Sequence, residues 1–495
     1  MAPGRGPPFP LTILVTNGGF DGMSAKTDTA MAKSLSLWNF FTIGFGAIIG
    51  TGWILLVGDW MTEGGGPIPA MIAFAIGALF LLPVGAVFGE LTAAIPVSGG
   101  SVEYVDRAFG RTASFITAWF LALGNAIIVP WESIAIANLA GELMPFLKTI
   151  KLYEVMGAPI YLPTLVLGCA GAAYVIYLNV KGAASAAKLQ GFLTKVLLGG
   201  MGVTILLSFI KGSPANLTPV FTPTGNANSL WLGVLPVLVM TPFFYAGFDT
   251  IPQQAEEAAE GLDWRKFGVI ISMALLAAGG FYLLAIYGFG SFIPWQQFVT
   301  YNIPALTVLG VVGLGIFGKI MMAVAMISPL GPMNSFFGAS TRIMLAMGRK
   351  GQLPPSFAKL HPQYKTPTAA NLLMAVLALA GPFLGPNMLV PLTNISSLGF
   401  IIGCLMVSCA CLKLRATEPD LNRPYTVPGG KVGIWAAIIA CAVIVGLMVV
   451  PFSPAALSAQ EWAIVAVWLV LGVIFMLTRR AGRRSEGQPK AQAAD

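Results

Sequence analysis

Long apolar segments alternate with short polar ones along most of the chain. A helix needs roughly 20 mainly apolar residues to cross the hydrocarbon core of a bilayer, so each segment of this length predicts a membrane-spanning helix. The pattern predicts twelve such helices and therefore an all-α polytopic membrane protein. The twelve segments lie at about 35–60, 67–93, 112–141, 160–180, 189–210, 231–255, 267–291, 305–330 (with an apolar continuation toward 346), 368–386, 389–413, 432–452 and 460–479.

Composition and charge agree with this interpretation. Hydrophobic residues make up 56% of the 495 residues and charged residues 10%, whereas about 25% charged residues is typical of soluble domains. Of the 28 lysines and arginines, three fall in the predicted outer loops, two fall within spans, and all others lie on the inner side. Cytoplasmic loops retain positive charge, so both termini are expected in the cytoplasm and the protein in the inner (plasma) membrane. The net charge of +8 thus reflects topology, and no nucleic-acid partner is expected.

Two of the predicted spans are interrupted. In the first span, "GFGAIIGTGW" at 44–53 places four glycines in an apolar helix, where each glycine costs about 1 kcal/mol relative to alanine. In the sixth span, "VLVMTPFFYAGFDTIPQQAEE" at 237–257 contains two prolines, one glycine and one aspartate. Unwound backbone within a membrane is tolerated where it lines a cavity, and matching breaks in two halves of a chain indicate a transporter site.

The pairing of these two spans predicts the domain organisation. Two five-helix repeats are expected at 35–211 and 231–414, followed by two additional transmembrane helices at 432–479. The segments at both ends, 1–34 and 480–495, are polar or rich in glycine and proline. Because such segments cannot bury enough apolar surface to fold, we expect them to be disordered cytoplasmic tails.

Four segments carry a family resemblance. "GFGAIIGTGW" and "FFYAGFDTIPQQAEE" (243–257) resemble the first and sixth helices of the amino acid–polyamine–organocation (APC) transporters. "GELTAAIPVSGGSVEYVDRAFG" (89–110) resembles the loop after the second helix, although Val102 stands where the family usually has an aromatic residue. "GASTRIMLAMGRKGQLPPSFAKLHPQYKTP" (338–367) resembles the eighth helix and the loop after it. The chain is identified as a member of this family, similar to bacterial amino acid permeases.

The resemblance implies the fold of the bacterial leucine transporter and secondary transport of an amino acid or a related amine by alternating access. At the first break, Thr51 and Gly52 would donate backbone N–H groups to the substrate carboxylate, beside the opening after Gly50. Free N–H groups and the positive end of a half-helix suit an anion. The carbonyl of Ile48 would accept from the substrate ammonium. A Cβ added at Gly50 or Gly52 is expected to crowd this approach.

At the second break, the resemblance implies that the carbonyls of Ala246 and Phe248 accept from the same ammonium. The family places an aromatic gate over the substrate just before this break. Phe243, Phe244 and Tyr245 occupy that stretch here. Aromatic residues of apolar helices also serve as core or lipid-facing residues, and both roles stay open for these three side chains.

Four residues are candidates for proton coupling or gating: Asp249, Glu132, Lys195 and Tyr245. An acid such as Asp249 within a membrane is costly enough to indicate a function. Glu132 lies nearer the outer end of the third span, where it either faces the aqueous vestibule or joins a buried ion pair. Some relatives carry a proton-switching lysine on the fifth helix, but the alignment places Leu197 at that position. Lys195 is two residues away, which is roughly 200° around a helix.

The sequence leaves several transport mechanisms open, and two other classes of membrane protein have to be considered. Proton-coupled transport, uniport and exchange of amino acids, amines or polyamines are all compatible with the sequence. A channel would need rings of like charge or repeated carbonyl filters, and a membrane enzyme would need a catalytic constellation. Neither pattern is found, so an enzyme is not expected. The five cysteines lie within predicted spans and are interpreted as packing residues, so no metal or cofactor is expected; the expected partners are a small-molecule substrate, protons and membrane lipids.

Overall fold

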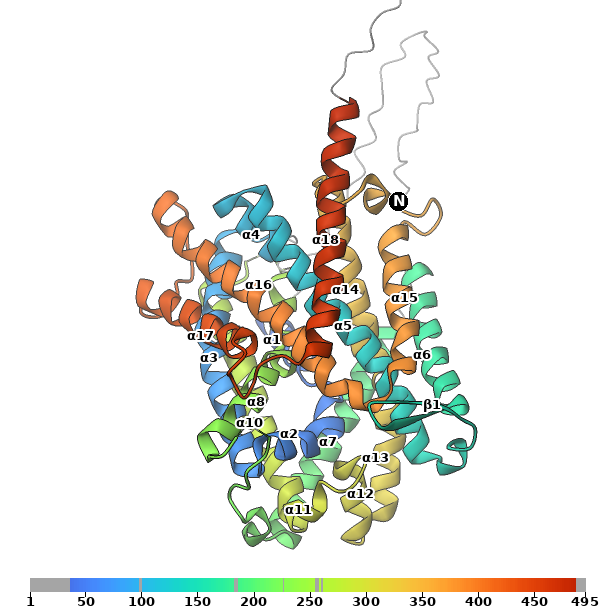
Figure 1. Ribbon diagram of the computed structural model, residues 1–495. Helices are drawn as coiled ribbons and strands as arrows, with labels where there is room; N and C mark the ends of the chain where they lie inside the picture. The colour runs from blue at the N-terminus through green and yellow to red at the C-terminus, as the bar shows by residue number, and fades with distance from the viewer. Residues whose placement is uncertain are drawn as a thin grey trace, which may run out of the picture. The chain divides into compact units, whose positions relative to one another are not determined.

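The computed structural model describes residues 36–97, 100–181, 186–225, 227–253, 258–259 and 261–486. Most of these residues are helical (Figure 1). The helices of the first half are α1 (Leu37–Ile48), α2 (Gly52–Gly64), α3 (Pro67–Ala94), α4 (Gly100–Phe109), α5 (Arg111–Leu143), α6 (Leu162–Lys181) and α7 (Ala186–Lys211). The helices of the second half are α8 (Leu230–Tyr245), α9 (Thr250–Gln253), α10 (Phe267–Phe292), α11 (Trp295–Phe298), α12 (Pro304–Val311), α13 (Gly315–Ile327), α14 (Leu330–Arg349), α15 (Thr368–Leu384), α16 (Leu389–Thr417), α17 (Lys431–Val449) and α18 (Ala459–Glu486).

The described residues support eight or nine of the twelve predicted spans. Eight helical segments are long and apolar enough to cross a membrane, and the bent pair of α1 and α2 makes a ninth. The other three predicted spans coincide with α7 and with the shorter apolar helices α8 and α15, which have 16 and 17 residues. The protein is therefore an all-α polytopic membrane protein.

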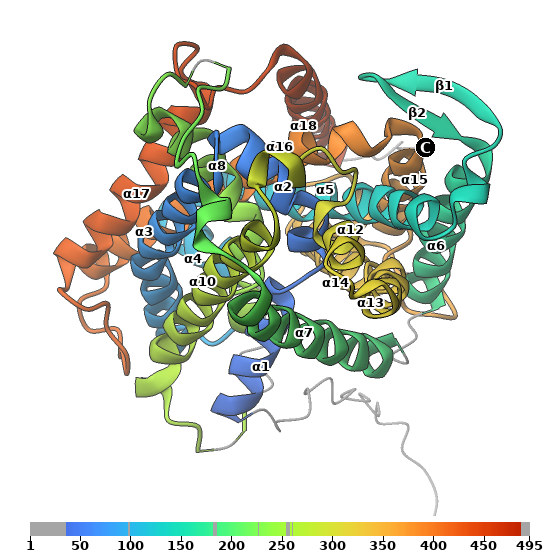
Figure 2. The ribbon, with the colours of Figure 1, turned by 90° about the horizontal axis from the view of Figure 1, so that it is seen from below.

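In Figure 2, α3 and α17 lie on one side of the view and α6 and α15 on the other. Helix α3 contacts α8, α10 and α17, α5 contacts α6, α14 and α15, and α16 packs against both α5 and α17. Small residues let these helices approach closely, as is usual in membranes. A Cβ at Gly399 of α16 would lie 2.7 Å from the backbone nitrogen of Gly124 on α5. The close pairing of α5 with α16 thus depends on glycine on both helices.

A short β-hairpin departs from the all-α prediction. Strands β1 (Lys151–Val155) and β2 (Ala158–Tyr161) pair antiparallel in the connection between α5 and α6. The two residues of the turn, Met156 and Gly157, both have positive φ, at 50° and 78°. This is the backbone of a tight two-residue hairpin turn whose twist matches that of the strands. The hairpin was not predicted because its turn carries a methionine in place of the usual asparagine or aspartate.

The eighth predicted span begins later than the apolar pattern indicates. The apolar run from 305 is divided into α12 and a separate helical segment that starts at Gly315. Gly313 between them has a φ of +82°, a conformation that glycine adopts without strain. The predicted start at 305 was therefore wrong, because an apolar run does not by itself show where the backbone turns.

The last helix also differs from the prediction. The sequence predicts a disordered tail from residue 480, but α18 continues to Glu486. Alanine, arginine and glutamate in this stretch all favour helix, and a helix already formed is extended at little cost. The predicted tail is thus helical up to residue 486, whereas residues 1–34 and 487–495 lie outside the described part of the chain.

Two tryptophans attach α18 to the rest of the structure. The indole N–H of Trp119 on α5 donates to the carbonyl of Trp468 at 3.0 Å, and the indole N–H of Trp468 donates to the carbonyl of Trp119 at 3.1 Å. The two rings stack with centroids 4.4 Å apart. Both buried indole donors are thereby satisfied without a second polar side chain, as apolar surroundings require.

A buried ion cluster joins α3, α16 and the connection between α16 and α17. The carboxylate of Glu90, which is fully buried, accepts from Arg415 Nε at 2.8 Å and from Arg415 Nη2. Arg423 Nε lies 3.4 Å from the same carboxylate, and the backbone N–H of Val427 donates to it at 2.7 Å. We refer to Glu90, Arg415, Arg423 and Val427 as the Glu90 cluster.

Candidate functional site

Two helix breaks meet inside the structure. The chain bends by 53° between α1 and α2, and four residues separate the end of α8 from the start of α9. Gly247, in the second break, has a φ of +124°. A Cβ there would lie 2.8 Å from the backbone of Ala47 and Ile48, so only glycine allows the two unwound segments to touch. The breaks that the sequence places about 200 residues apart therefore form one site.

The start of α2 presents unpaired backbone donors. The N–H groups of Thr51, Gly52 and Trp53 have no hydrogen-bond partner among the described residues, whereas the next two N–H groups of α2 donate to the carbonyl of Thr51. The first N–H groups of a helix lack intrahelical partners and carry the positive end of the helix dipole. Such a helix start within an apolar interior is suited to an anionic group.

The carbonyls at the breaks are only partly free. The carbonyl of Ile48 accepts from the N–H of Gly50 at 3.1 Å, and the carbonyl of Phe248 accepts from the N–H of Ile251 at 3.2 Å. The hydroxyl of Tyr282 on α10 lies 3.1 Å from the carbonyl of Ile48 and 2.9 Å from that of Phe244. Its single proton is shared between the two. Tyr282 therefore connects the two breaks.

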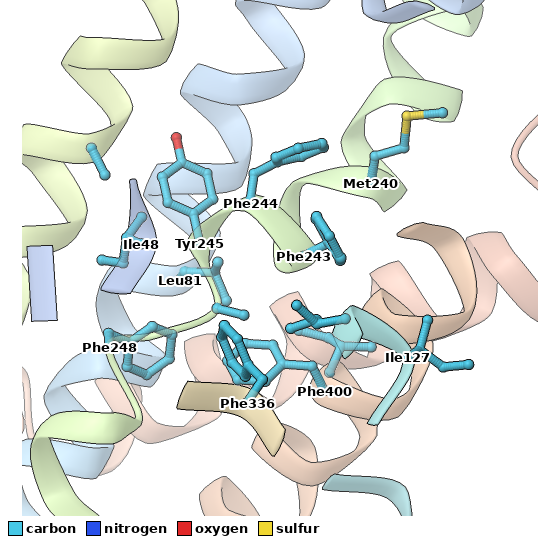
Figure 3. Close-up of a cluster of buried hydrophobic side chains, with 14 of the residues drawn as sticks. Ile48, Leu81, Ile127, Met240, Phe243, Phe244, Tyr245, Phe248, Phe336 and Phe400 are labelled. Carbon is cyan, nitrogen blue, oxygen red and sulfur yellow. The ribbon is translucent and has the colours of Figure 1, made fainter. Parts of the chain in front are cut away.

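A small cavity lies between the breaks. Its volume is about 30 Å³, which corresponds to about two water molecules. The rings of Phe243 and Phe244 on α8 and of Phe336 on α14 line this space. Figure 3 shows these three rings among the buried hydrophobic side chains. The lining residues are Ala47, Ile48, Gly50, Gly52, Ile128, Trp131, Glu132, Phe243, Phe244, Ala246, Tyr282, Pro332 and Phe336.

Glu132 belongs to the wall of this cavity. Its side chain is 4% exposed, and its carboxylate accepts a hydrogen bond of 3.3 Å from the hydroxyl of Thr51. No ion pair to Glu132 is found among the described residues. The buried ion pair is thus not found in the described part of the chain, and the position of Glu132 in the aqueous vestibule stays a prediction. The chain places this acid next to the helix start that suits an anion.

Three of the predicted residues are buried outside the cavity wall. The hydroxyl of Tyr245 donates to the carbonyl of Phe74 at 2.9 Å. The ring of Phe248 packs edge-on against those of Phe88 and Phe400. Asp249 is 5% exposed, and its carboxylate accepts from the N–H of Gly247 at 3.1 Å. These three side chains thus belong to the second break or lie next to it, but they do not line the cavity.

Lys195 is not among the residues that line the cavity. Its side chain is exposed on α7, whereas the side chain of Leu197, two residues further on, is 3% exposed. The aligned position of the family lysine is thus occupied by a buried leucine, and the amine two residues earlier points away from the interior. A long lysine side chain on such a surface can extend its amine to the membrane interface.

Besides the small or aliphatic Ala47 and Ile128, the sequence did not indicate four residues that the structure adds to the site: Trp131, Tyr282, Pro332 and Phe336. They come from three helices that show no interruption at these positions. Tyr282 offered one signal, since a polar-tipped aromatic in an apolar helix needs a hydrogen-bond partner. The other three are ordinary residues of apolar helices, and only their place beside the breaks gives them a role.

Comparisons with known proteins agree with this architecture. The sequence profile of the family described as "Amino acid permease" matches residues 35–475. A branched-chain amino acid permease of Bacillus subtilis is 27% identical, covering 93% of this chain and 96% of the relative. A methylthioribose transporter of the same organism is 25% identical, covering 92% and 96%, and its aspartate-proton symporter is 25% identical, covering 80% and 76%.

Proposed function

We propose, because the chain belongs to the amino acid permease family, that it carries an amino acid or a related amine across the plasma membrane by alternating access. The observation that supports this most directly is the meeting of two helix breaks around a cavity. Relatives that match nearly the whole chain include a branched-chain amino acid permease and a transporter of methylthioribose, which is not an amino acid. At about 25% identity, the substrate is proposed here only as a class.

In this proposal the unpaired N–H groups of Thr51 and Gly52 bind the substrate carboxylate. A zwitterion that leaves water needs polar partners at both of its ends, since an uncompensated charge in an apolar site is costly. Backbone carbonyls of Ile48, Ala246 and Phe248 take the ammonium. Because two of these carbonyls already accept hydrogen bonds, the ammonium shares or replaces those bonds when it binds.

The rings of Phe243 and Phe244 act as the gate over this site. Ligand pockets commonly enclose about 300–1,000 Å³, far more than the cavity between the breaks. Side chains must therefore move before a substrate fits. Phe244 packs against Trp60, Phe74 and Tyr282, so its displacement is coupled to α2, α3 and α10, the elements that surround both breaks.

The number of membrane-spanning helices and the side on which each loop lies are also proposed. The family implies a leucine-transporter-like fold, with twelve helices, two inverted repeats of five, and two additional helices. Both termini would lie in the cytoplasm, as the distribution of lysine and arginine indicates. Addition of a membrane-impermeant thiol reagent to cysteines placed one at a time in the loops of a cysteine-free variant would establish the side of each loop.

Uptake by proteoliposomes tests the proposed function. The purified protein should first be screened with the twenty standard amino acids and with simple amines, because a substrate stabilises the folded state by about 2.7 kcal/mol at a hundredfold excess over Kd. The compounds that raise Tm are then used in uptake. A carrier should saturate and should show counterflow, in which unlabelled substrate inside the vesicles accelerates uptake of labelled substrate. Flux that does not saturate and shows no counterflow would indicate a channel.

A further inference from the structure

Glu132 is a buried acid whose carboxylate lacks a positive partner among the described residues. Its one hydrogen bond comes from the hydroxyl of Thr51, at 3.3 Å, which is long for such a bond. A buried charge is normally paired or satisfied by several hydrogen bonds, because the loss of hydration is otherwise uncompensated. Glu132 also lines the cavity between the breaks, so a bound ligand would reach it directly.

The groups that face Glu132 from the neighbouring helices are almost all apolar. Phe243 and Phe244 come from α8, and Pro332 and Phe336 come from α14. The one other titratable group in the cavity wall is the hydroxyl of Tyr282 on α10, which is engaged with two carbonyls.

Behind Glu132, the neighbouring residues on α5 are equally uncharged. The indole of Trp131 donates to the carbonyl of Leu389 and to the hydroxyl of Thr393 on α16. A Cβ added at Gly168 of α6 would lie 2.9 Å from the carbonyl oxygen of Ser133, and the Ser133 hydroxyl donates to the carbonyl of Pro130 at 2.8 Å. No counter-charge from the described residues approaches Glu132 on this side.

Charged side chains are present on the surrounding elements but form no ion pair with Glu132. They are Asp59 and Glu63 of α2, Glu103, Asp106 and Arg107 of α4, Arg111 and Glu142 of α5, Lys181 of α6, Asp249 beside α8, Lys319 of α13, Arg342 and Arg349 of α14, and Lys413 and Arg415 of α16. The protein thus supplies no fixed positive charge for this carboxylate within the described residues.

A substrate carboxylate at the start of α2 would lie beside Glu132. The hydroxyl that bonds Glu132 and the N–H proposed to bind the substrate belong to the same residue, Thr51. Two carboxylates that share a site repel each other, and one of them then holds a proton. A positive group in the side chain of a substrate would relieve the repulsion as well, but a neutral amino acid has no such group, and a proton on Glu132 then removes the repulsion.

We propose that Glu132 binds a proton whenever a substrate carboxylate binds at the start of α2, so that substrate and proton occupy the site together. The inference rests on the proposed function and adds its coupling step. The proton comes from the aqueous phase to which the site is open and adds to one oxygen of the carboxylate. It returns to water on the opposite side when the substrate leaves. By linkage, each ligand raises the affinity for the other by the same factor.

Isothermal titration of the purified protein in detergent measures this linkage. The probe is the neutral amino acid that raises Tm most in the screen, titrated in two buffers with different ionisation enthalpies. We expect the wild-type protein to take up about one proton per substrate when Glu132 is ionised in the free protein. In that pH range its Kd rises tenfold per pH unit. Glu132→Gln, which is neutral at every pH, should take up no proton and show a Kd that does not change with pH.

Glu461→Gln provides the matched control. Glu461 is likewise a buried glutamate, 4% exposed, but it is bonded by Asn394 and by the N–H of Ser458 and lies outside the cavity wall. This variant should keep the proton uptake of the wild type. If Glu132→Gln does not fold, Glu132→Asp tests whether the proton binds at this position. Its side chain is shorter, which should shift the pH at which Kd begins to rise.

Several results would overturn the proposal. Proton uptake that persists in Glu132→Gln, or a pH profile unchanged in Glu132→Asp, would assign the proton to another group. A Glu132→Gln variant that binds the neutral probe with the proton uptake of the wild type but no longer binds L-lysine would make Glu132 a subsite for a cationic side chain. If no amino acid or amine binds or shows counterflow with the wild type, the proposed function itself fails, and with it this inference.

Discussion

Two buried glutamates in apolar helices differ sharply in their surroundings. Glu90 on α3 is surrounded by two guanidinium groups and a backbone N–H, at distances from 2.7 to 3.4 Å for Arg415 Nε, Arg423 Nε and Val427 N. Glu132 on α5 has one hydroxyl at 3.3 Å and otherwise faces aromatic rings and a cavity. Burial is nearly the same, at 0% and 4% exposure. The partners therefore decide what each acid does.

The difference separates a structural acid from a functional one. In the Glu90 cluster both carboxylate oxygens accept hydrogen bonds and pair with arginines, so the carboxylate holds three segments of chain in place. Glu132 keeps unused acceptor capacity where a ligand would enter. A buried acid within a membrane is a candidate for function by default, and the count of its protein partners separates the two cases.

The largest effect is expected from Glu90→Gln. Removal of one partner from a buried ion pair leaves the other charge uncompensated, which costs about 3–5 kcal/mol. The Glu90 cluster contains two such arginines, whose side chains are 16% and 12% exposed. We expect a strong loss of folded protein, measured as Tm in detergent and as the monodisperse fraction after gel filtration.

Glu132→Gln is expected to change Tm much less than Glu90→Gln does. It loses one long hydrogen bond from a hydroxyl and no ion pair, so its Tm should stay close to that of the wild type. Equal losses of Tm in Glu90→Gln and Glu132→Gln would contradict the distinction between the two acids.

The next largest effect concerns transport through the cavity that Glu132 faces. A Cβ at Gly52 would lie 2.6 Å from the ring of Phe244, whereas a Cβ at Gly50 would make an ordinary contact of 3.8 Å with Pro332. The two glycines therefore differ in how closely protein atoms surround them, and the expected crowding of the substrate at both positions stays a prediction. Gly52→Val should reach the membrane but lose transport, and Gly50→Ala should keep a measurable part of it. Initial uptake rates at equal surface expression give the comparison, and normal kinetics in Gly52→Val would refute the backbone site.

A smaller effect is expected at Asp249, another buried acid. Its carboxylate accepts from the N–H of Gly247 within the second break, so it supports the turn as Glu90 supports its segments. Asparagine keeps an acceptor at this position, and Asp249→Asn should lower uptake by less than about fivefold, the equivalent of one hydrogen bond of about 1 kcal/mol. Asp249→Ala should lower it further. Loss of accumulation driven by a pH gradient in Asp249→Asn, with exchange retained, would show instead that Asp249 carries the coupled proton.

The smallest effect is expected at Lys195. Its side chain is exposed while that of Leu197 is buried, and Lys195 does not line the cavity. Lys195→Met should alter neither expression nor the dependence of uptake on pH, measured side by side with Glu132→Gln. A flattened pH profile in Lys195→Met at normal expression would place the proton on α7 and remove it from Glu132.

Much of the fold follows from patterns that act locally along the chain. The apolar segments predict membrane helices because a bilayer offers backbone groups no partners outside the helix. The two breaks were predicted from glycines and prolines, which weaken a helix wherever they stand in it, and the ends of α1 and α8 lie within those stretches. The start at 305 and the β-hairpin were not predicted correctly, since turns depend on backbone angles that several residues can adopt.

The sequence by itself determined that the chain lies in a membrane, where its helices are interrupted and which family it resembles, because hydropathy and helix breaking are properties of short segments. Only the tertiary structure decided which acid faces the site. Glu90, Glu132 and Asp249 look alike in sequence, each a single carboxylate in an apolar stretch. Their roles depend on side chains that arrive from other helices: Arg415 reaches Glu90, whereas Glu132 meets the rings of Phe243 and Phe336. Such contacts join residues more than 100 positions apart, and no local pattern records them.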